Sequence, residues 1–150
     1  MSNYLIAGAS KGIGHQLAKQ LLNEGHSIHN CSRTPSDLPG VNNIELDLAA
    51  ENFSFPPPDN LDGLAYCLGT INLKPFHRLT EEDFLADYKI NVLSAVKLIQ
   101  TCLPALQKSS SASIVLFSTV AASTGMGFHT SIASAKSALT GLGLSLAAEL

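Results

Sequence analysis

The chain has 150 residues, of which 45% are hydrophobic and 14% charged, and its formal net charge is −3. This composition is typical of a globular protein with one hydrophobic core, and it excludes a disordered chain. The nine lysines and arginines are scattered along the sequence, so no basic patch for nucleic acid or an anionic membrane surface is expected. Any anion site must therefore be local.

The three cysteines, Cys31, Cys67 and Cys102, show neither CxxC nor metal-ligand spacing. Their odd number favours buried thiols in a reducing compartment over disulfides or a metal site. The N-terminus lacks a charged start followed by an apolar run, so no signal peptide is expected. The longest apolar stretch, residues 132–150, contains Lys136 and several hydroxyl side chains, which favours a buried or interface helix over a membrane span. We therefore expect a cytoplasmic protein without membrane, nucleic-acid or metal partners.

Short apolar runs alternate with longer segments of helical period, which predicts repeated βα units on a parallel sheet. Strands are expected at residues 3–8, 26–31, 43–47, 61–67 and 113–118. The first helix should follow Gly12 and end at Gly25, with Ile13, Leu17 and Leu21 on one buried stripe.

A second long helix is expected from the capping residue Thr80 to about residue 107. Its apolar positions, which bracket Asn91 on one face, are Phe84, Tyr88, Ala95 and Leu98. A third helix should begin near Ser131 and run to residue 150.

The connection between the third and fourth strands contains the proline-rich segment 53–60, FSFPPPDN, which leaves no room for a full helix. Right-handed crossovers then give the strand order 3-2-1-4-5. The predicted fold is an α/β, doubly wound parallel sheet in three layers, with a ligand crevice at the carboxyl ends of strands one and four.

The strongest motif is AGASKGIG at residues 7–14, between a predicted strand and an amphipathic helix. Gly8 permits a tight turn, Gly12 allows the backbone to approach a diphosphate, and Gly14 lets the helix pack closely. The free N–H groups of the helix then face the anion. The alternative is a turn that needs glycines for its conformation and binds no ligand.

The GxxxGxG spacing resembles the short-chain dehydrogenase/reductase family, and the resemblance extends through essentially all of the chain. It implies a single Rossmann-type domain over residues 1–150 that binds a nicotinamide nucleotide. The residues that would form the cofactor turn are Gly8, Ser10, Lys11, Gly12, Ile13 and Gly14.

After the second strand, relatives that prefer NAD usually carry an acid, whereas this chain has Ser32 and Arg33. Lys11 and Arg33 resemble the basic pair with which family members hold the 2′-phosphate of NADP, so NADP(H) is expected in preference to NAD(H). An ordinary solvated pair is the alternative. Asp47 and Leu48 match the family's contact to the adenine ring, although an Asp that ends a strand can simply cap a turn.

Three further positions match the family's site around the nicotinamide. Gly69 is the one residue kept where relatives have Asn-Asn-Ala-Gly, because the chain reads Tyr66-Cys67-Leu68-Gly69. Asn91 matches the helix asparagine that supports a proton-relay water, unless it is a tolerated polar residue at a helix kink. Lys136 matches the active-site lysine that binds the nicotinamide ribose.

The family's Tyr-x-x-x-Lys pair is incomplete, because Ile132 stands four residues before Lys136. Where the catalytic serine usually lies stands Thr119, with Ser118 beside it, and either hydroxyl can orient a carbonyl or simply end a strand. His129 shares the helical stripe of Ile132 and Lys136 if the helix begins early, and it is then a candidate replacement acid. A loop or cap histidine is the alternative, and Tyr66 is a weaker candidate acid.

Together these features predict an oxidoreductase that transfers hydride between NADP(H) and a small-molecule carbonyl or alcohol. The alternative is a non-catalytic NADP(H)-binding protein with a regulatory or redox-sensing role. Family domains usually continue for two more strands and a substrate-covering segment, so we expect the chain to lack that part. The small, apolar faces of the second and third helices resemble those that pair subunits in family homodimers and homotetramers.

Overall fold

The computed structural model describes residues 1–150, which divide into two compact units. Unit 1 comprises Met1–Cys67 and Lys97–Val115, and unit 2 comprises Leu68–Val96 and Leu116–Leu150. The predicted glycine-rich turn therefore belongs to unit 1, and the predicted catalytic positions belong to unit 2.

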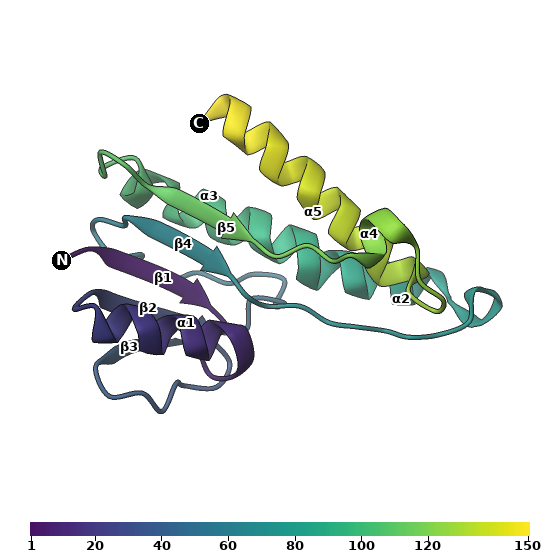
Figure 1. Ribbon diagram of the computed structural model, residues 1–150, viewed down its shortest axis with the longest axis horizontal. Helices are drawn as coiled ribbons and strands as arrows, with labels where there is room; N and C mark the ends of the chain where they lie inside the picture. Colours follow the sequence, from purple (N-terminus) through teal and green to yellow (C-terminus); the bar gives the residue numbers. More distant parts are fainter. The chain divides into compact units, whose positions relative to one another are not determined.

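A five-stranded sheet forms the framework of the fold (Figure 1). Its order is β3-β2-β1-β4-β5, and β1 pairs in parallel with both β2 and β4, as β2 does with β3. The predicted strand order is thereby confirmed. The strands are β1 Asn3–Ala7, β2 Ser27–Ser32, β3 Val41–Glu45, β4 Gly63–Tyr66 and β5 Ser113–Leu116.

The predicted strands overlap the observed ones, but their ends differ. The third strand begins at Val41, two residues earlier than predicted, and β5 ends at Leu116, before the hydroxyl residues 118 and 119. The proline-rich segment 53–60 contains no helix, as its composition predicted.

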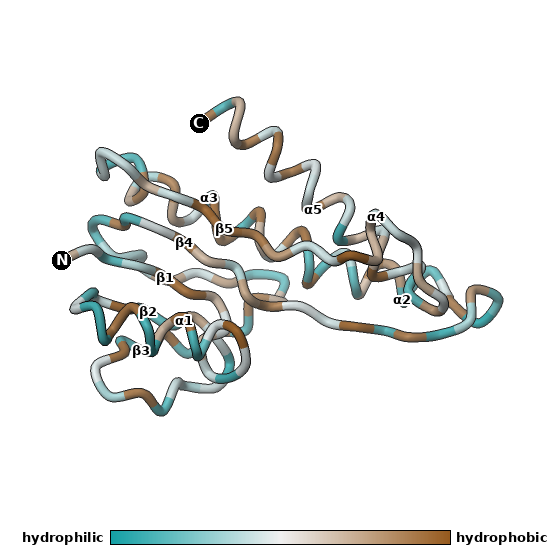
Figure 2. Tube along the Cα trace, viewed as in Figure 1, coloured by the Kyte–Doolittle hydropathy of each residue, from teal (hydrophilic) through white to brown (hydrophobic).

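Helices lie on both faces of the sheet, giving the predicted three-layer α/β architecture (Figure 1). Helix α1, Gly12–Asn23, packs on one face, where Ile6 and Ile28 meet Ala18. Figure 2 shows hydrophobic residues along β1 and β4, and mixed hydrophobic and hydrophilic positions along α1. This pattern suits a sheet covered by an amphipathic helix.

The predicted buried stripe of α1 was wrong at Ile13, whose side chain is 63% exposed. The fully or nearly buried residues of this helix are Gly14 and Ala18, with Leu17 and Leu21 partly buried against the same core. Small residues therefore face the sheet at the start of the helix. Ile13, in the first turn, projects into solvent instead.

The second predicted helix is three consecutive segments: α2 Glu81–Tyr88, a π-helical turn η2 Lys89–Leu93, and α3 Ser94–Leu106. A π turn holds more residues than an α turn, so it rotates the side chains on either side relative to each other. Tyr88 is 41% exposed, contrary to the prediction, while Asp87 and Asn91, four residues apart, are buried.

The remaining helices are short except for the last. They are η1 Phe76–Arg78, α4 Ala121–Thr124 and α5 Thr130–Glu149, the last beginning one residue before the predicted start. No helix combines the length and the apolar character that a membrane crossing requires.

None of the three cysteines forms a disulfide. Cys31 and Cys102 are buried, as expected, but Cys67 is only partly buried. Burial disfavours the charged thiolate and raises the pKa of Cys31 to about 12 and that of Cys102 to about 11.

Candidate functional site

The glycine-rich turn of unit 1 has a backbone that only glycine accommodates well. Gly8 and Gly12 have φ values of 92° and 63°, in the left-handed region that other residues rarely adopt. A Cβ atom on Gly14 would lie 2.2 Å from the carbonyl oxygen of Gly8. The helix thus begins in direct contact with the turn that precedes it.

The turn is held in place by Asn30, a residue that the sequence analysis did not single out. Its Oδ1 accepts a hydrogen bond from the Ala9 N–H at 2.9 Å, and its Nδ2 donates to Asn43 Oδ1 at 2.9 Å. The single Ser32 hydroxyl proton is shared between Asn30 Oδ1, 3.1 Å from Oγ, and the Thr34 carbonyl oxygen, 2.6 Å from it. A polar residue at a fully buried position of β2 was the available signal.

The basic side chains of unit 1 are exposed around this turn. Lys11 is the N-cap residue of α1 and makes no side-chain capping bond. Arg33 follows β2 directly, and neither cation forms an ion pair. Because the N–H groups of a first helical turn have no partners within the helix, the start of α1 can receive an anion.

Asp47 and Leu48 follow β3. The Asp47 Oδ1 accepts a hydrogen bond from the Ala49 N–H at 2.9 Å, so the side chain caps a turn, while Leu48 is buried. This geometry is compatible with a contact to an adenine ring and with a purely structural turn cap at Asp47.

In unit 2, Gly69, Asn91 and Lys136 come together. A Cβ atom on Gly69 would lie 3.0 Å from Asn91 Oδ1 and 3.5 Å from Lys136 Nζ. The Lys136 ammonium donates to the Phe117 carbonyl oxygen at 2.8 Å. Asn91 is fully buried, and its Oδ1 has no hydrogen-bond partner.

The hydroxyl groups of Ser118 and Thr119 are engaged differently. Ser118 Oγ donates to the Lys136 carbonyl oxygen at 3.2 Å and accepts from Thr140 Oγ1 at 2.9 Å. Thr119 Oγ1 accepts from the Ala121 N–H at 3.3 Å, at the start of α4. The Thr119 hydroxyl proton therefore remains available for donation, whereas the Ser118 hydroxyl already donates its proton to the Lys136 carbonyl oxygen of α5.

The structure places Ile132 and the two candidate replacement acids, His129 and Tyr66, in different environments. Ile132 lies on α5 with 4% of its surface exposed. His129 is the N-cap residue of α5, with its Nδ1 2.6 Å from the Gly127 carbonyl oxygen. Tyr66 is fully buried on β4 in unit 1.

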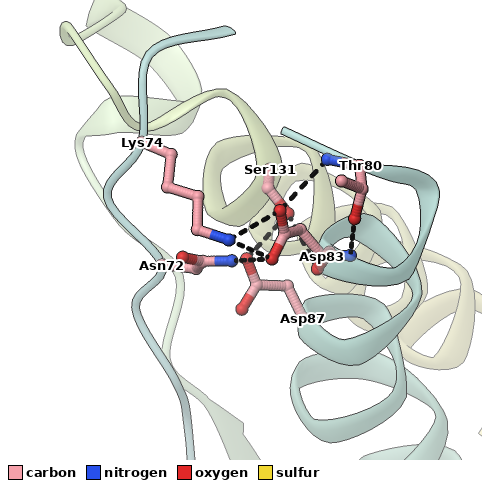
Figure 3. A network of polar contacts seen from close by, with 6 residues as sticks. All are labelled: Asn72, Lys74, Thr80, Asp83, Asp87 and Ser131. Carbon is pink, nitrogen blue, oxygen red and sulfur yellow. Dashed lines mark hydrogen bonds and ion pairs between the residues drawn. The ribbon is translucent and has the colours of Figure 1, made fainter. Parts of the chain in front are cut away.

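A second polar cluster of unit 2 also escaped the sequence analysis (Figure 3). Lys74 Nζ contacts both carboxylate oxygens of Asp83, at 2.7 and 2.9 Å, and Asn72 Nδ2 donates to the same side chain at 2.7 Å. Asp83 and Thr80 form a reciprocal capping box at the start of α2. The Lys74 ammonium, followed by the Thr80 N–H and Asn72, lowers the pKa of Asp83 to about 2.

Comparison with known proteins identifies the family. The short chain dehydrogenase model matches residues 45–150. A tropinone reductase homologue of Arabidopsis thaliana is 30% identical over 97% of this chain and 60% of its own length. The 3-oxoacyl-[acyl-carrier-protein] reductase MabA of Mycobacterium bovis is 27% identical over 97% of this chain and 62% of its own length.

Solved structures agree with this fold. A short chain dehydrogenase family protein from Francisella tularensis is similar with a TM-score of 0.87 at 24% identity, covering 100% of this chain and 64% of that one. The aldohexose dehydrogenase of Thermoplasma acidophilum has a TM-score of 0.88 at 20% identity, covering 99% of this chain and 61% of that one. The chain thus spans less than two thirds of the length of these relatives. It belongs to the short-chain dehydrogenase/reductase family of oxidoreductases.

Proposed function

We propose that the chain is an NADP(H)-dependent oxidoreductase that interconverts a small-molecule carbonyl and the corresponding alcohol. The observation that carries this proposal is the convergence of Asn91 Oδ1 and Lys136 Nζ beside Gly69. A buried acceptor without a partner is costly to maintain, which favours a functional reason for it. In its family, this asparagine and this lysine belong to the reaction site.

The cofactor proposal rests on unit 1. The diphosphate would bind the N–H groups at the start of α1, which the turn formed by Gly8, Ser10, Gly12 and Gly14 exposes. The exposed Lys11 and Arg33, next to Ser32, would hold the 2′-phosphate that distinguishes NADP from NAD. Ile13 would pack against the cofactor, and Asp47 with Leu48 would contact the adenine ring.

The bound cofactor would supply or accept the hydride. The chain's own contribution would come from unit 2, where Lys136 would bind the nicotinamide ribose and place a positive charge in the site. Asn91 Oδ1 would accept a hydrogen bond from a water molecule in the proton path. Of the two neighbouring hydroxyls, Thr119 is the better donor to a substrate carbonyl, because the Ser118 hydroxyl already donates to the Lys136 carbonyl oxygen.

The proton donor is the unusual feature of this site, since Ile132 has no proton to give. A positioned general acid contributes about 10²–10⁴-fold to rate, which is roughly 3–5 kcal/mol of barrier. His129 is our candidate. A carbonyl oxygen can only accept, so its contact with Gly127 places a proton on Nδ1, and donation through Nε2 then requires the imidazolium form.

NADPH oxidation over a panel of aldehydes and ketones tests the proposal. Lys136→Ala should lower turnover at least about 100-fold, as loss of a positioned charge does. Lys108→Ala, which removes an exposed lysine of unit 1, is the matched control and should leave turnover unchanged. Turnover that persists in Lys136→Ala would contradict the proposed site, and His129→Ala measures the contribution of the proposed acid.

Cofactor preference has a separate test. Arg33→Gln removes one charge-assisted contact to a phosphate, which should weaken NADPH binding by about 10- to 100-fold and leave NADH binding nearly unchanged. Arg78→Gln, in unit 2, is the charge-matched control. Equal losses for NADPH and NADH would contradict a 2′-phosphate role.

Ile132 specifically favours a second candidate function, a non-catalytic NADP(H)-binding protein with a regulatory or redox-sensing role. Its buried side chain occupies the position where family members place their general acid. NADPH affinity without turnover on any carbonyl would support this candidate. A gain of reductase activity in Ile132→Tyr would then show that the remaining groups are in place.

We also propose that the protein acts in the cytoplasm, where its three thiols stay reduced, and that it forms homodimers or homotetramers. Exposed apolar residues of α2 support subunit pairing: Leu85 is 59% and Tyr88 41% exposed. Burying such residues between copies would remove apolar surface from water. Leu85→Glu should shift the mass measured by analytical ultracentrifugation toward the monomer.

A further inference from the structure

We propose that Asp87 is a positioning residue that fixes the orientation of the Asn91 side-chain amide. This inference rests on the proposed function, in which the Asn91 oxygen faces the reaction site. All the groups involved belong to unit 2. Asp87 and Asn91 lie one turn apart where α2 passes into η2, and their exposed fractions are 2% and 0%.

A directional chain of hydrogen bonds connects the two residues. Asn91 Nδ2 donates to Thr70 Oγ1 at 3.1 Å and to the Asp87 carbonyl oxygen at 2.8 Å. Thr70 Oγ1 in turn donates its single proton to Asp87 Oδ1 at 2.8 Å. Because a carboxylate can only accept, it forces the Thr70 hydroxyl to act as an acceptor toward Asn91.

This arrangement allows only one orientation of the Asn91 amide. Both hydrogens of Nδ2 have acceptors, so Oδ1 points the other way, toward Gly69 and Lys136. A flipped amide would place Oδ1 against the Asp87 carbonyl oxygen and against a hydroxyl whose proton is already committed. Neither of these groups could donate to it.

The Asp87 carboxylate is itself fixed from the other side. Ser131 Oγ, at the start of α5, donates to Asp87 Oδ2 at 2.7 Å, and Figure 3 shows both side chains beside Asp83. No lysine, arginine or histidine forms an ion pair with Asp87. What Thr70 requires from position 87 is therefore an acceptor oxygen rather than a negative charge.

Four variants of the full chain test this chain of bonds. Asp87→Leu and Thr70→Val remove the acceptor and the hydroxyl, respectively, and should release the Asn91 amide. Asp87→Asn and Thr70→Ser keep an acceptor oxygen and a hydroxyl, and should preserve its orientation. Lys74→Gln is the control. It breaks the ion pair with Asp83, which lies on α2 as Asp87 does, and it leaves the hydrogen bonds of Asp87 intact.

The primary measurement is hydrogen exchange of the Asn91 Nδ2 protons by ¹⁵N NMR, with the signal identified by its loss in Asn91→Asp. Exchange should be roughly tenfold faster in Asp87→Leu and Thr70→Val, as expected for loss of one hydrogen bond, and close to the original rate in the conservative variants and the control. Because Thr70 is exposed, Thr70→Val tests the proposal even if Asp87→Leu does not fold.

Turnover and cofactor affinity complete the test. With a carbonyl substrate, kcat should fall in Asp87→Leu and Thr70→Val and recover in Asp87→Asn and Thr70→Ser, while the Kd for NADPH stays within about twofold, since the turn in unit 1 is untouched. Unchanged Asn91 exchange in Thr70→Val, or an Asp87→Asn variant as impaired as Asp87→Leu, would overturn the proposal. If the original chain shows no turnover, the proposed function fails, and the exchange pattern alone decides this inference.

Discussion

The contact between Gly14 and Gly8 leaves no room for a side chain at position 14. A Cβ at position 14 would lie 2.2 Å from the Gly8 carbonyl oxygen and 2.9 Å from its carbonyl carbon, and backbone atoms cannot move aside as a flexible side chain can. We expect Gly14→Ala to destabilise the protein by about 1–3 kcal/mol, in the range of overpacked sites. It should also weaken NADPH binding, because it displaces the turn. Urea unfolding and a fluorescence titration measure the two effects.

Gly141→Ala is the matched control for this substitution. A Cβ there meets no atom within 4 Å, and the residue is exposed on α5. Since alanine favours helix by about 1 kcal/mol over glycine, this variant should be slightly more stable and bind NADPH normally. If Gly14→Ala had the same stability and the same NADPH affinity as the original chain, neither property would depend on the close approach of α1 to the turn at Gly8.

Individual residues were predictable where a spacing rule applied to them. The glycine pattern located the turn, because strand, glycines and helix must occur in that order for the backbone to bend there. Asn30 escaped, because its role depends on the Ala9 N–H, 21 residues away in the sequence. Asp87 escaped for the same reason, since its partner Ser131 is 44 residues away. Long-range hydrogen bonds leave no periodic signal in a single sequence.

At the scale of the element, α2 is stabilised by a carboxylate whose ionisation depends on pH. Lys74, the Thr80 N–H and Asn72 hold the pKa of Asp83 at about 2, below its ordinary value of 3.8. A lowered carboxyl pKa contributes stability that is fully present above the unfolded-state value and is lost as the pH falls through the folded-state value. We expect this contribution to disappear between about pH 4 and pH 2.

Urea unfolding of Asp83→Asn between pH 7 and pH 2 checks this prediction. The variant should be less stable than the original chain at pH 7, and the two should converge as the pH approaches 2. Lys74→Met removes the largest cause of the shift, so its pH-dependent loss of stability should be smaller than in the original chain and should be complete at a higher pH. A constant difference between Asp83→Asn and the original chain over the whole range would contradict the assignment.

Helix α2 itself was predictable from Thr80 and from the apolar period, but the π turn that follows it was not. The inward-facing side chains around it include Asp87 and Asn91, four residues apart, while Tyr88 is exposed, so the inward stripe runs through a polar residue and not through the neighbouring tyrosine. Nothing in the composition of KINVL distinguishes a π turn from an ordinary helical turn. The hydrogen bonds of Asp87 to Thr70 and Ser131 therefore required the structure.

At the scale of the whole molecule, the sheet order was predictable because parallel strands need long, right-handed crossovers. The division into two units was not, because residues from separate stretches of the chain make up each unit. Units 1 and 2 carry different parts of the proposed chemistry, with the glycine-rich turn in one and Lys136 in the other. The cofactor and the reaction can therefore be tested separately.

The buried thiols of unit 1 provide such a test. Cys31 and Cys102 lie in the same unit as the glycine-rich turn, and their pKa values of about 12 and about 11 leave very little thiolate at neutral pH. Alkylation at these positions should consequently follow opening of unit 1. A ligand that binds only the folded unit lowers the open population by the factor 1 + [L]/Kd, so NADPH at 100 times its Kd should slow alkylation about 100-fold.

Mass spectrometry of the alkylated peptides measures both rates, and NADH at the same concentration provides the comparison. If Lys11 and Arg33 hold the 2′-phosphate, NADH should protect much less than NADPH, and Arg33→Gln should remove most of that difference. Equal alkylation rates with and without NADPH would show that the turn does not bind it. Protection in a protein without turnover would instead identify the nucleotide-binding, non-catalytic candidate, because binding at the turn of unit 1 does not require the acid that Ile132 replaces.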